Sequence, residues 1–244
     1  MTKLTECKGY SDEKGNRVIG SFQNCEVIFS GSNSTLKIGD NFNAGQMKIS
    51  IGSNCNIDIG NSVTTRGSFW NFYDNATCSI GDNCHFRDSG FLSIAPFAKI
   101  IIGSGFTVEF DYTMIALPYS EIRFGEDCMV SRRVSVQSND GHDIFDVKTC
   151  QNINATVELS KSRKIIIGNH VWIGQDVSVL YNTDIADGSI IGAKSLVKNK
   201  FPNNCIAGGN PAKIIKTNIA WSRGYGDTDI NVIDKRYVRL TDNI

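Results

Sequence analysis

The sequence contains little proline, little histidine and no excess of charge of either sign. Its 244 residues include only four prolines, so it has no proline-rich linker. Lys plus Arg and Asp plus Glu balance at 25 each. This balance argues against a nucleic-acid or anionic-membrane partner recognised by bulk charge, because phosphate neutralisation needs a basic excess. No run approaches the roughly 18 apolar residues that a membrane-spanning helix needs, so we expect no membrane span.

Signatures of secretion and of disulfide bonding are also absent. The N-terminal stretch MTKLTECKGYSDEKGN is polar and lacks the apolar centre of a signal peptide. None of the eight cysteines forms a CxxC pair, and without a secretory signal a disulfide framework is not expected. With 41% hydrophobic and 20% charged residues, the chain can build a sizeable core. These features predict a soluble cytoplasmic protein with reduced thiols.

A six-residue period dominates the C-terminal part of the sequence. An aliphatic side chain recurs at Ile167, Ile173, Val179, Ile185, Ile191 and Val197. This spacing fits neither an amphipathic helix, with a period of about 3.6, nor a lone alternating strand. It fits a coil of three short parallel strands joined by tight corners, with one aliphatic side chain per strand pointing inward. Eighteen residues then complete one coil, so Ile167 is predicted to lie beneath Ile185, Ile173 beneath Ile191 and Val179 beneath Val197.

The same turn recurs upstream at a longer spacing. Pairs of a large apolar residue and a glycine follow one another at intervals of 21, 21, 22 and 22 residues: Ile38-Gly39, Ile59-Gly60, Ile80-Gly81, Ile102-Gly103 and Phe124-Gly125. The three or four extra residues of each coil predict a ridge along one corner. The next pair, Ile167-Gly168, comes 43 residues later, so one turn is disguised or interrupted, with Phe145 as the candidate for the disguised position. Three cysteines fall at inward positions and are interpreted as small packing residues, not metal ligands: Cys55, Cys84 and Cys128.

The chain is therefore interpreted as all-β, with one long parallel β-helix and no convincing domain boundary. Residues 1–17 are expected to form an N-terminal cap, and residues 18–210 the β-helix. The polar stretch 146–164 is out of phase with the repeat and is predicted to loop out as an excursion. Residues 211–244 are expected to form a short C-terminal helix, over PAKIIKTNIAWSRG, and a tail.

Three motifs between Gly168 and Lys216 carry a specific resemblance. The tetrad VWIG, the turn GAKSLV and the exit GNPAKII together resemble the hexapeptide-repeat acyltransferases, a family that includes galactoside, maltose, nodulation-factor and capsular-polysaccharide O-acetyltransferases. The similarity covers residues 120–223 well, and the earlier coils match only in pattern. The resemblance implies a left-handed β-helix, a homotrimer, and acetyl-coenzyme A bound between neighbouring subunits.

The sequence has three histidines, and acyl transfer to a hydroxyl needs a base whose pKa lies near neutrality. His142 lies in SNDGHDIFD, and the family places its catalytic histidine in a similar D-x-H stretch before a loop excursion. We therefore expect His142 to be the base. Asp140 is favoured, on proximity and resemblance, as the acceptor that orients the imidazole, although a backbone carbonyl would also serve. His85 and His170 are expected to be ordinary corner and turn residues.

The resemblance also implies where the cofactor and the acceptor bind. The backbone N–H of Gln175 is the implied donor to the oxyanion, a role worth roughly 3–4 kcal/mol for a good donor. Gly174 lets a ligand approach the backbone closely, and Gly192 with Ala193 is expected to do the same for the pantetheine amides. Trp172 points outward in the repeat and is implied to line the acceptor and pantetheine cleft, with a trimer contact as the open alternative.

Basic residues complete the set of candidate ligands. Arg132 and Arg133 could pair with an acidic sugar such as a sialic or uronic acid. Four residues near the C-terminal end are expected to bind coenzyme A: Lys194, Lys198, Pro211 and Lys213. An ordinary solvated face is the open alternative for these lysines, and only Lys213, in the NPAKII exit, has support from the resemblance.

These residues predict an acetyl-coenzyme A-dependent O-acetyltransferase that modifies a sugar hydroxyl, such as one of a bacterial capsule or other surface polysaccharide. N-acylation of a nucleotide-linked amino sugar on the same scaffold is the alternative. A zinc hydratase would require three histidine ligands at repeating positions, which the spacing of the three histidines does not provide, so no metal is expected. An ice-binding solenoid would require ranked threonines on one face, and the sequence has no such array.

Overall fold

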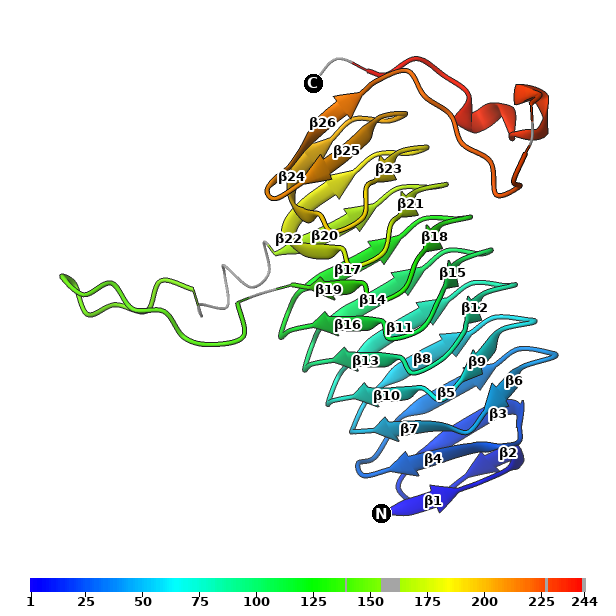
Figure 1. Cartoon of the computed structure of the whole chain (residues 1–244). Helices are drawn as coiled ribbons and strands as arrows, with labels where there is room; N and C mark the ends of the chain where they lie inside the picture. The colour runs from blue at the N-terminus through cyan, green and yellow to red at the C-terminus, as the bar shows by residue number, and fades with distance from the viewer. Residues whose placement is uncertain (139, 155–162, 227, 243–244) are drawn as a thin grey trace.

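The polypeptide winds into a coil whose short strands stack along one axis (Figure 1). The computed structural model describes residues 1–138, 140–154, 163–226 and 228–242. Strands of successive coils pair in parallel, so the parallel β-helix predicted from the six-residue period is confirmed.

Each coil contributes to three faces. The first face contains β3 (Arg17–Phe22), β5 (Thr35–Ile38), β8 (Asn56–Ile59), β11 (Thr77–Ile80), β14 (Lys99–Ile102), β17 (Glu121–Phe124) and β20 (Lys164–Ile167). The second face contains β6 (Asn43–Gly45), β9 (Thr64–Arg66), β12 (His85–Phe86), β15 (Thr107–Val108), β18 (Met129–Val130), β21 (Trp172–Ile173), β23 (Ile190–Ile191) and β25 (Ile206–Gly209). The third face contains β4 (Cys25–Phe29), β7 (Met47–Ile51), β10 (Phe69–Phe72), β13 (Phe91–Ile94), β16 (Thr113–Ala116) and β19 (Ser135–Gln137). In the last coils β22 (Ser178–Ile185) and β24 (Leu196–Phe201) run from the third face into the first.

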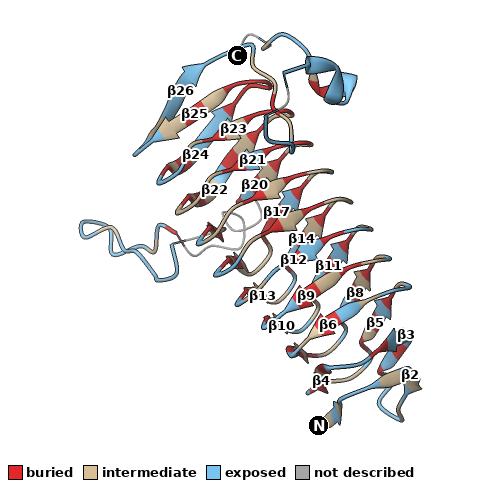
Figure 2. Cartoon of the chain, turned by 45° about the vertical axis from the view of Figure 1, so that its right-hand side comes forward, coloured by how far each residue is buried: buried red, intermediate tan, exposed pale blue. Residues whose placement is uncertain are grey.

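The strand register agrees with the repeat. Ile167 pairs with Ile185, Ile173 with Ile191 and Val179 with Val197, as predicted. In the longer coils one column on the first face consists of Ile38, Ile59, Ile80, Ile102 and Phe124. All of these side chains are buried, and buried positions alternate with more exposed ones along the strands (Figure 2). Each coil therefore adds to one continuous apolar column, which is how a solenoid buries a core without a second layer.

The extra residues of the longer coils lie at the third corner, which we define as the connection from the third face to the first. Trp70 and Val179 belong to one column, and Cys78 and Thr183 belong to the next. The two columns are eight residues apart in the long coil and four apart in the short coil. The predicted ridge at one corner is therefore confirmed.

The close stacking of the coils explains the glycine that follows each aliphatic residue. A Cβ on Gly81 would lie 2.6 Å from the backbone nitrogen of Ser104, and a Cβ on Gly103 would lie 2.5 Å from the carbonyl carbon of Gly125. Coils spaced about 4.8 Å apart leave no room for a side chain there.

The inward cysteines are packing residues, as predicted. Cys55, Cys84 and Cys128 are buried, and all eight cysteines are free thiols. Burial raises the pKa of the Cys84 thiol to about 11 and that of the Cys128 thiol to about 12. These thiols therefore stay protonated at neutral pH and are poor nucleophiles.

Antiparallel strands cover both ends of the β-helix. At the N-terminal end β1 (Thr2–Leu4) pairs with β4, and β2 (Cys7–Ser11) pairs with β3. At the C-terminal end β26 (Ala212–Lys216) pairs with β25. The predicted helix beginning at Pro211 is therefore wrong. The open edge of β25 offers backbone partners to the β-branched pair Ile214-Ile215, and local propensity could not reveal that edge. The tail instead contains two 3₁₀ turns, η1 (Ile230–Val232) and η2 (Lys235–Tyr237).

The 43-residue interval is one interrupted coil, because Phe124 pairs directly with Ile167. The disguised turn at Phe145 is therefore wrong. Residues 138–163, between β19 and β20, form the excursion, which starts earlier than the predicted 146–164. Ile144 and Phe145 are apolar, like the inward residues of the repeat, yet both side chains are exposed. Residues 139 and 155–162 of this segment lie outside the described residues. None of the helices found in the described part of the chain has the length and apolar character to span a membrane.

Candidate functional site

The excursion is a folded protrusion that leaves the β-helix at the third corner and extends away from it (Figure 1). At its base, Ser138 Oγ accepts a hydrogen bond from the Leu117 N–H at 2.8 Å. Farther out, the Ile153 N–H donates to the Ile144 carbonyl at 2.8 Å and the Asp146 N–H donates to the Gln151 carbonyl at 2.9 Å. These bonds close a hairpin that begins two residues after His142.

The side-chain amide of Asn154 clamps this turn. Its Nδ2 donates to the backbone carbonyl of His142 at 2.8 Å and to Asp140 Oδ2 at 3.1 Å. Its Oδ1 accepts from the Ile144 N–H at 2.7 Å. Asn154 is buried, so both ends of its amide are satisfied where water has little access. The His142 carbonyl, the Ile144 N–H and the Asp140 side chain are therefore all tied to one residue.

Arg163 joins this clamp to the β-helix. Its Nη2 donates to the Asn154 carbonyl at 2.6 Å and lies 3.8 Å from Asp140 Oδ2. The guanidinium lies over the ring of Tyr181, 4.7 Å from its centroid, and the Arg163 side chain is only 7% exposed. A cavity of about 280 Å³ separates the excursion from the corner and is lined by Asp140, Ile144, Ile153, Asn154, Arg163, Tyr181 and Asn182.

His142 is exposed, and among the described residues its ring has no hydrogen-bond partner. Asp140 does not orient it in this structure, because the carboxylate accepts from Asn154 and faces Arg163. The local sequence could not predict these partners, since Arg163 lies 23 residues from Asp140.

A second group of predicted residues lies at the second corner, which connects the second face to the third. The backbone N–H of Gln175 has no acceptor among the described residues, as an oxyanion donor requires. Arg132 Nε donates to Gln175 Oε1 at 3.2 Å, and its guanidinium lies 5.6 Å from the centroid of the Phe110 ring. Arg133 instead pairs with Asp176 through contacts of 2.6 and 3.0 Å. Arg132 is thus beside the candidate oxyanion donor, whereas Arg133 already has a carboxylate partner.

The two glycines of this corner differ in what requires them. A Cβ on Gly174 would lie 2.7 Å from the backbone nitrogen of Ala193, so packing between coils already demands glycine there. A Cβ on Gly192 would make only ordinary van der Waals contacts, the nearest at 3.5 Å from the Ala207 carbonyl oxygen, so packing between coils does not demand glycine there. Ala193 and Lys194 are exposed, and the Lys194 N–H donates to the Gln175 carbonyl at 2.8 Å.

The other predicted cofactor residues are dispersed. Lys198 lies at the third corner, with its Nζ 4.6 Å from the centroid of the Tyr181 ring. Pro211 and Lys213 are exposed at the C-terminal end of the β-helix.

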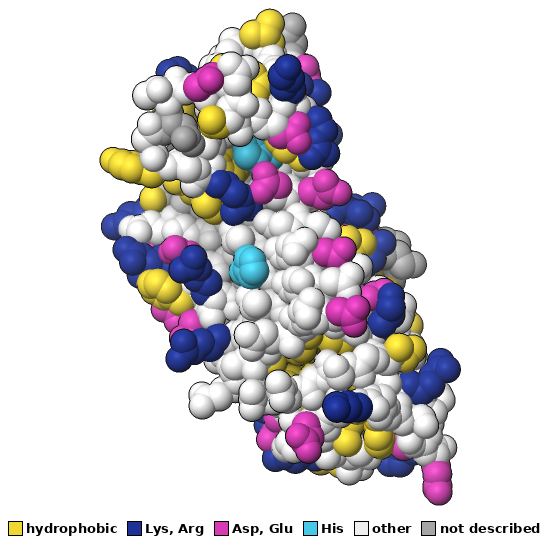
Figure 3. Space-filling view, turned by 90° about the vertical axis from the view of Figure 1, so that its right-hand side faces the viewer, with side chains coloured by type: hydrophobic (Ala, Val, Ile, Leu, Met, Phe, Trp, Pro, Cys, Tyr) yellow, Lys and Arg dark blue, Asp and Glu magenta, His cyan; other side chains and the backbone are white. Residues whose placement is uncertain are grey.

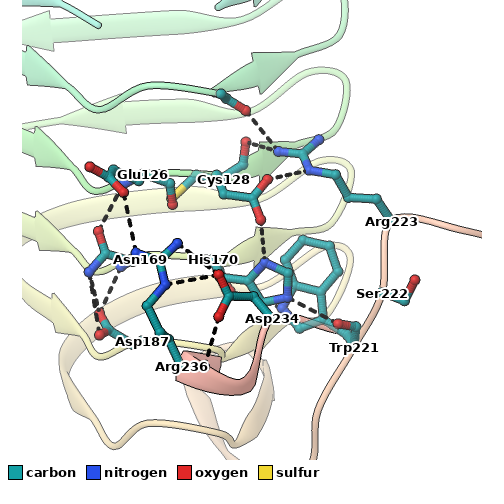
Figure 4. A network of polar contacts seen from close by, with 12 residues as sticks. Glu126, Cys128, Asn169, His170, Asp187, Trp221, Ser222, Arg223, Asp234 and Arg236 are labelled. Carbon is teal, nitrogen blue, oxygen red and sulfur yellow. Dashed lines mark hydrogen bonds and ion pairs between the residues drawn. The ribbon is translucent and has the colours of Figure 1, made fainter. Parts of the chain in front are cut away.

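The C-terminal tail folds back over the second face and covers His170 (Figure 4). The imidazole of His170 stacks between Trp221 and Tyr237, with ring centroids 4.0 and 4.5 Å away. Its Nδ1 lies 2.6 Å from Asp127 Oδ2 and its Nε2 lies 3.0 Å from the Trp221 carbonyl. His170 is thus a buried anchor for the tail. Trp172 is 37% exposed and packs against Trp221 at 5.9 Å, so the tail covers part of it.

Asp127 links this anchor to the tail a second time, because its Oδ1 accepts from Arg223 Nε at 2.6 Å. Burial acts to raise the pKa of the carboxyl. The hydrogen bonds from His170 and Arg223 outweigh burial and hold the pKa of Asp127 below its usual value.

The structure therefore divides the predicted site residues between two corners. The third corner carries the His142 turn, and the second corner carries Gln175 and Arg132. Sequence reasoning missed Asn154, Arg163 and the anchoring role of His170, because each acts through partners far away in the sequence. Basic and acidic side chains are interspersed on the face shown in Figure 3, in agreement with the neutral net charge. The described residues contain no group of three or more His, Cys, Asp and Glu side chains that could hold a metal ion.

Comparisons with known proteins agree with the fold. The family model described as bacterial transferase hexapeptide (six repeats) matches residues 164–199. A polysialic acid O-acetyltransferase of Escherichia coli O1:K1 / APEC is 34% identical over 126 residues, which are 52% of this chain and 39% of the relative. WbbJ of Escherichia coli (strain K12), assigned as an O-acetyl transferase of lipopolysaccharide biosynthesis, is 31% identical over 150 residues, which are 60% of this chain and 70% of the relative.

A solved structure, that of the polySia-specific acetyltransferase NeuO, is similar over almost the whole chain. It has 29% sequence identity and a TM-score of 0.62, and the alignment covers 91% of each chain. The chain thus spans well under half of the first relative but nearly all of this solved structure.

Proposed function

The chain belongs to the bacterial hexapeptide-repeat acyltransferases, and from this premise we propose that it transfers the acetyl group of acetyl-coenzyme A to a sugar hydroxyl of a bacterial surface polysaccharide. The names of its relatives support this choice, because they include acetyltransferases for polysialic acid and for lipopolysaccharide biosynthesis. The observation that carries the proposal is the exposed imidazole of His142, presented on a clamped turn beyond the wall of the β-helix.

In this proposal His142 is the general base. Its imidazole takes the proton of the acceptor hydroxyl as the hydroxyl oxygen attacks the thioester carbonyl. The carbonyl oxygen gains negative charge, which the backbone N–H of Gln175 stabilises by a hydrogen bond. When the tetrahedral intermediate collapses, the C–S bond breaks and the imidazolium of His142 returns the proton to the leaving thiolate. Asn154 holds the His142 backbone throughout and so limits the motion of the base.

We propose that a second copy of the chain completes the site. His142 and Gln175 lie at different corners of one chain, so the two groups meet only if the excursion of one subunit reaches the second corner of its neighbour. A homotrimer provides three equivalent junctions of this kind. The exposed protrusion of the excursion and the unpaired N–H of Gln175 both support this assembly.

The second corner also fits acetyl-coenzyme A. Packing does not require glycine at position 192, which is consistent with close approach of an extended pantetheine arm to this backbone, and the exposed Lys194 lies one coil from Gln175. Lys198 and Lys213 are exposed and remain our candidates for the phosphates. We place the reaction in the cytoplasm, where acetyl-coenzyme A is available to an enzyme with eight free cysteines.

Replacement of the base tests the proposal. We expect His142→Ala to lower kcat at least about 100-fold, because general-base assistance is worth that much or more. The assay follows thiol release from acetyl-coenzyme A with polysialic acid, colanic acid and lipopolysaccharide as acceptors. Unchanged turnover in a correctly assembled His142→Ala protein would contradict the mechanism. A mild effect together with transfer to a nucleotide-linked amino sugar would favour N-acylation, because an amine needs less help to lose its proton.

Mixed assemblies test the shared site. His142→Ala chains retain the Gln175 N–H, and Gln175→Pro chains retain the imidazole. Neither protein alone has a complete site, but random assembly of an equal mixture would restore about one quarter of the junctions. Failure of the mixture to regain activity would place the whole site within one chain.

A further inference from the structure

Two aromatic residues occupy an unusual backbone conformation on the ridge of the third corner. The turns Tyr73–Ala76, Ala95–Ala98 and Leu117–Ser120 stack in successive coils, each closed by a hydrogen bond of 3.0 to 3.1 Å from its last N–H to its first carbonyl. The third residue of each turn has a positive φ: 61° at Asn75, 62° at Phe97 and 66° at Tyr119. Asparagine is a common choice there, whereas a bulky side chain in this region is strained.

Phe97 and Tyr119 are the only Phe, Tyr or Trp residues with a positive φ among the described residues. Each follows a proline, Pro96 or Pro118, in the position of such turns that favours a fixed negative φ. Two of the four prolines in the sequence thus stand where they preorganise these turns. Strain of this kind persists where surrounding structure enforces it, and it concentrates at binding and catalytic sites.

The two rings stack on one another at the surface, where Phe97 is exposed and Tyr119 is half-buried. Their centroids are 5.1 Å apart and their planes differ by 1°. Phe97 is 54% exposed, although an aromatic ring of this size would normally be turned toward the core. The interior does not need these rings, because the core columns on either side of the corner are already filled by buried aliphatic residues.

The stack lies directly beneath the base of the excursion. Ser138, the first residue of the excursion, accepts a hydrogen bond from the N–H of Leu117, the first residue of the Tyr119 turn. Ser138 Oγ also lies 2.6 Å from Oγ of Ser120, the last residue of that turn. The aromatic stack and the protrusion that carries His142 therefore share one corner and one hydrogen-bonded support.

We propose that Phe97 and Tyr119 form a sugar-binding subsite for the polysaccharide acceptor, a claim that rests on the proposed function. The face of an aromatic ring carries partial negative charge, and the C–H groups on the face of a pyranose carry partial positive charge. A sugar ring packs against such a surface with little entropy cost, because both partners are rigid. A polymer held at the ridge would be retained close to the excursion while one of its hydroxyls is acetylated.

Asparagine substitutions test this subsite, because the corresponding turn of the preceding coil has asparagine, Asn75, at the same position. The double variant Phe97→Asn and Tyr119→Asn places at both positions the residue that Asn75 already provides in the same conformation. We expect the melting temperature to stay the same or rise, because the strain is relieved. We expect the Kd for a polysialic acid chain, measured by titration calorimetry without acetyl-coenzyme A, to rise about 10-fold. The Kd for acetyl-coenzyme A should not change.

A matched control is Tyr73→Asn, which removes a 48% exposed aromatic from the same ridge but outside the stack. This variant should bind polysialic acid like the wild type.

Colanic acid and lipopolysaccharide are titrated in parallel as alternative acceptors. Wild-type affinity of the double variant for every polymer that the wild type binds, or failure of the wild type to bind any of them, would overturn the subsite. Loss of the native oligomer in the double variant would also overturn it, by identifying the stack as a subunit contact. Binding by the wild type without acetyl transfer would instead contradict the proposed function and leave the subsite intact.

Discussion

Replacing Gln175 by proline removes the atom that the proposed oxyanion site requires, its backbone N–H. The structure indicates that the fold tolerates this change. Asp176 has a φ of 58°, so Gln175 precedes a residue in the left-handed region, as Pro96 precedes Phe97 on the ridge. Proline is favoured at this position of a turn. Because the Gln175 N–H has no acceptor among the described residues, its removal costs no hydrogen bond within the part of the chain that the structure covers.

The expected effect on catalysis is large. Loss of one oxyanion donor lowers kcat by about 10²- to 10³-fold, or roughly 3–4 kcal/mol of transition-state stabilisation. Because the contact forms fully only in the transition state, the KM for acetyl-coenzyme A should change little. The assay is steady-state thiol release, accompanied by thermal unfolding and a measurement of oligomeric state.

Gln175→Ala is the matched control. It keeps the N–H and removes only the side chain that accepts from Arg132 at 3.2 Å. We expect its kcat to remain within a few-fold of the wild type. A Gln175→Pro protein with native assembly, an unchanged melting temperature and wild-type kcat would refute the assignment. A large fall in melting temperature would refute the conclusion that this N–H is free in the fold.

Three further predictions concern the tail and the thiols. The pKa of Asp127 is lowered in the folded protein, so its stabilising contribution is present above the unfolded pKa of about 3.9 and is lost as the pH falls through the folded value. Thermal unfolding as a function of pH should show this loss, and Asp127→Asn should remove it. Trp221→Ala should release the tail from His170, at a cost of about 3–5 kcal/mol for a buried tryptophan, and limited proteolysis would detect the exposed tail. Cys150 is exposed and should react with a thiol reagent in the native protein. Cys128 is buried and its thiol has a pKa of about 12, so it should react only on unfolding. Rapid labelling of Cys128 in the native protein would contradict its inward placement.

Much of the β-helix could be predicted because its pattern is local. The aliphatic residues at Ile167, Ile173 and Val179 recur at the period of the coil, and each points inward whatever lies elsewhere in the chain. The pairing of Ile167 with Ile185 follows from counting residues through three corners. The extra residues of the longer coils had to lie at a corner for the same reason, because strands of adjacent coils must stay in register to pair.

The predictions failed where local pattern and tertiary contact disagree. Ile144-Phe145 has the composition of an inward pair, yet it lies on the excursion, because the next coil is already supplied by Lys164–Ile167. The PAKIIK stretch is a strand because β25 leaves an open edge beside it. Neither fact can be detected within a short window of sequence.

The sequence by itself determined the repeat, the inward columns, the presence of a ridge at one corner and the identity of His142 as an imidazole outside the core. Only the tertiary structure decided that His142 and Gln175 lie at different corners, that Asn154 and Arg163 hold the His142 turn, and that the tail packs over His170. The difference has a physical cause. A periodic pattern specifies how each residue meets its neighbours one coil away. Contacts such as that between Asp127 and Arg223 join segments 96 residues apart, and the repeat in the sequence does not predict them.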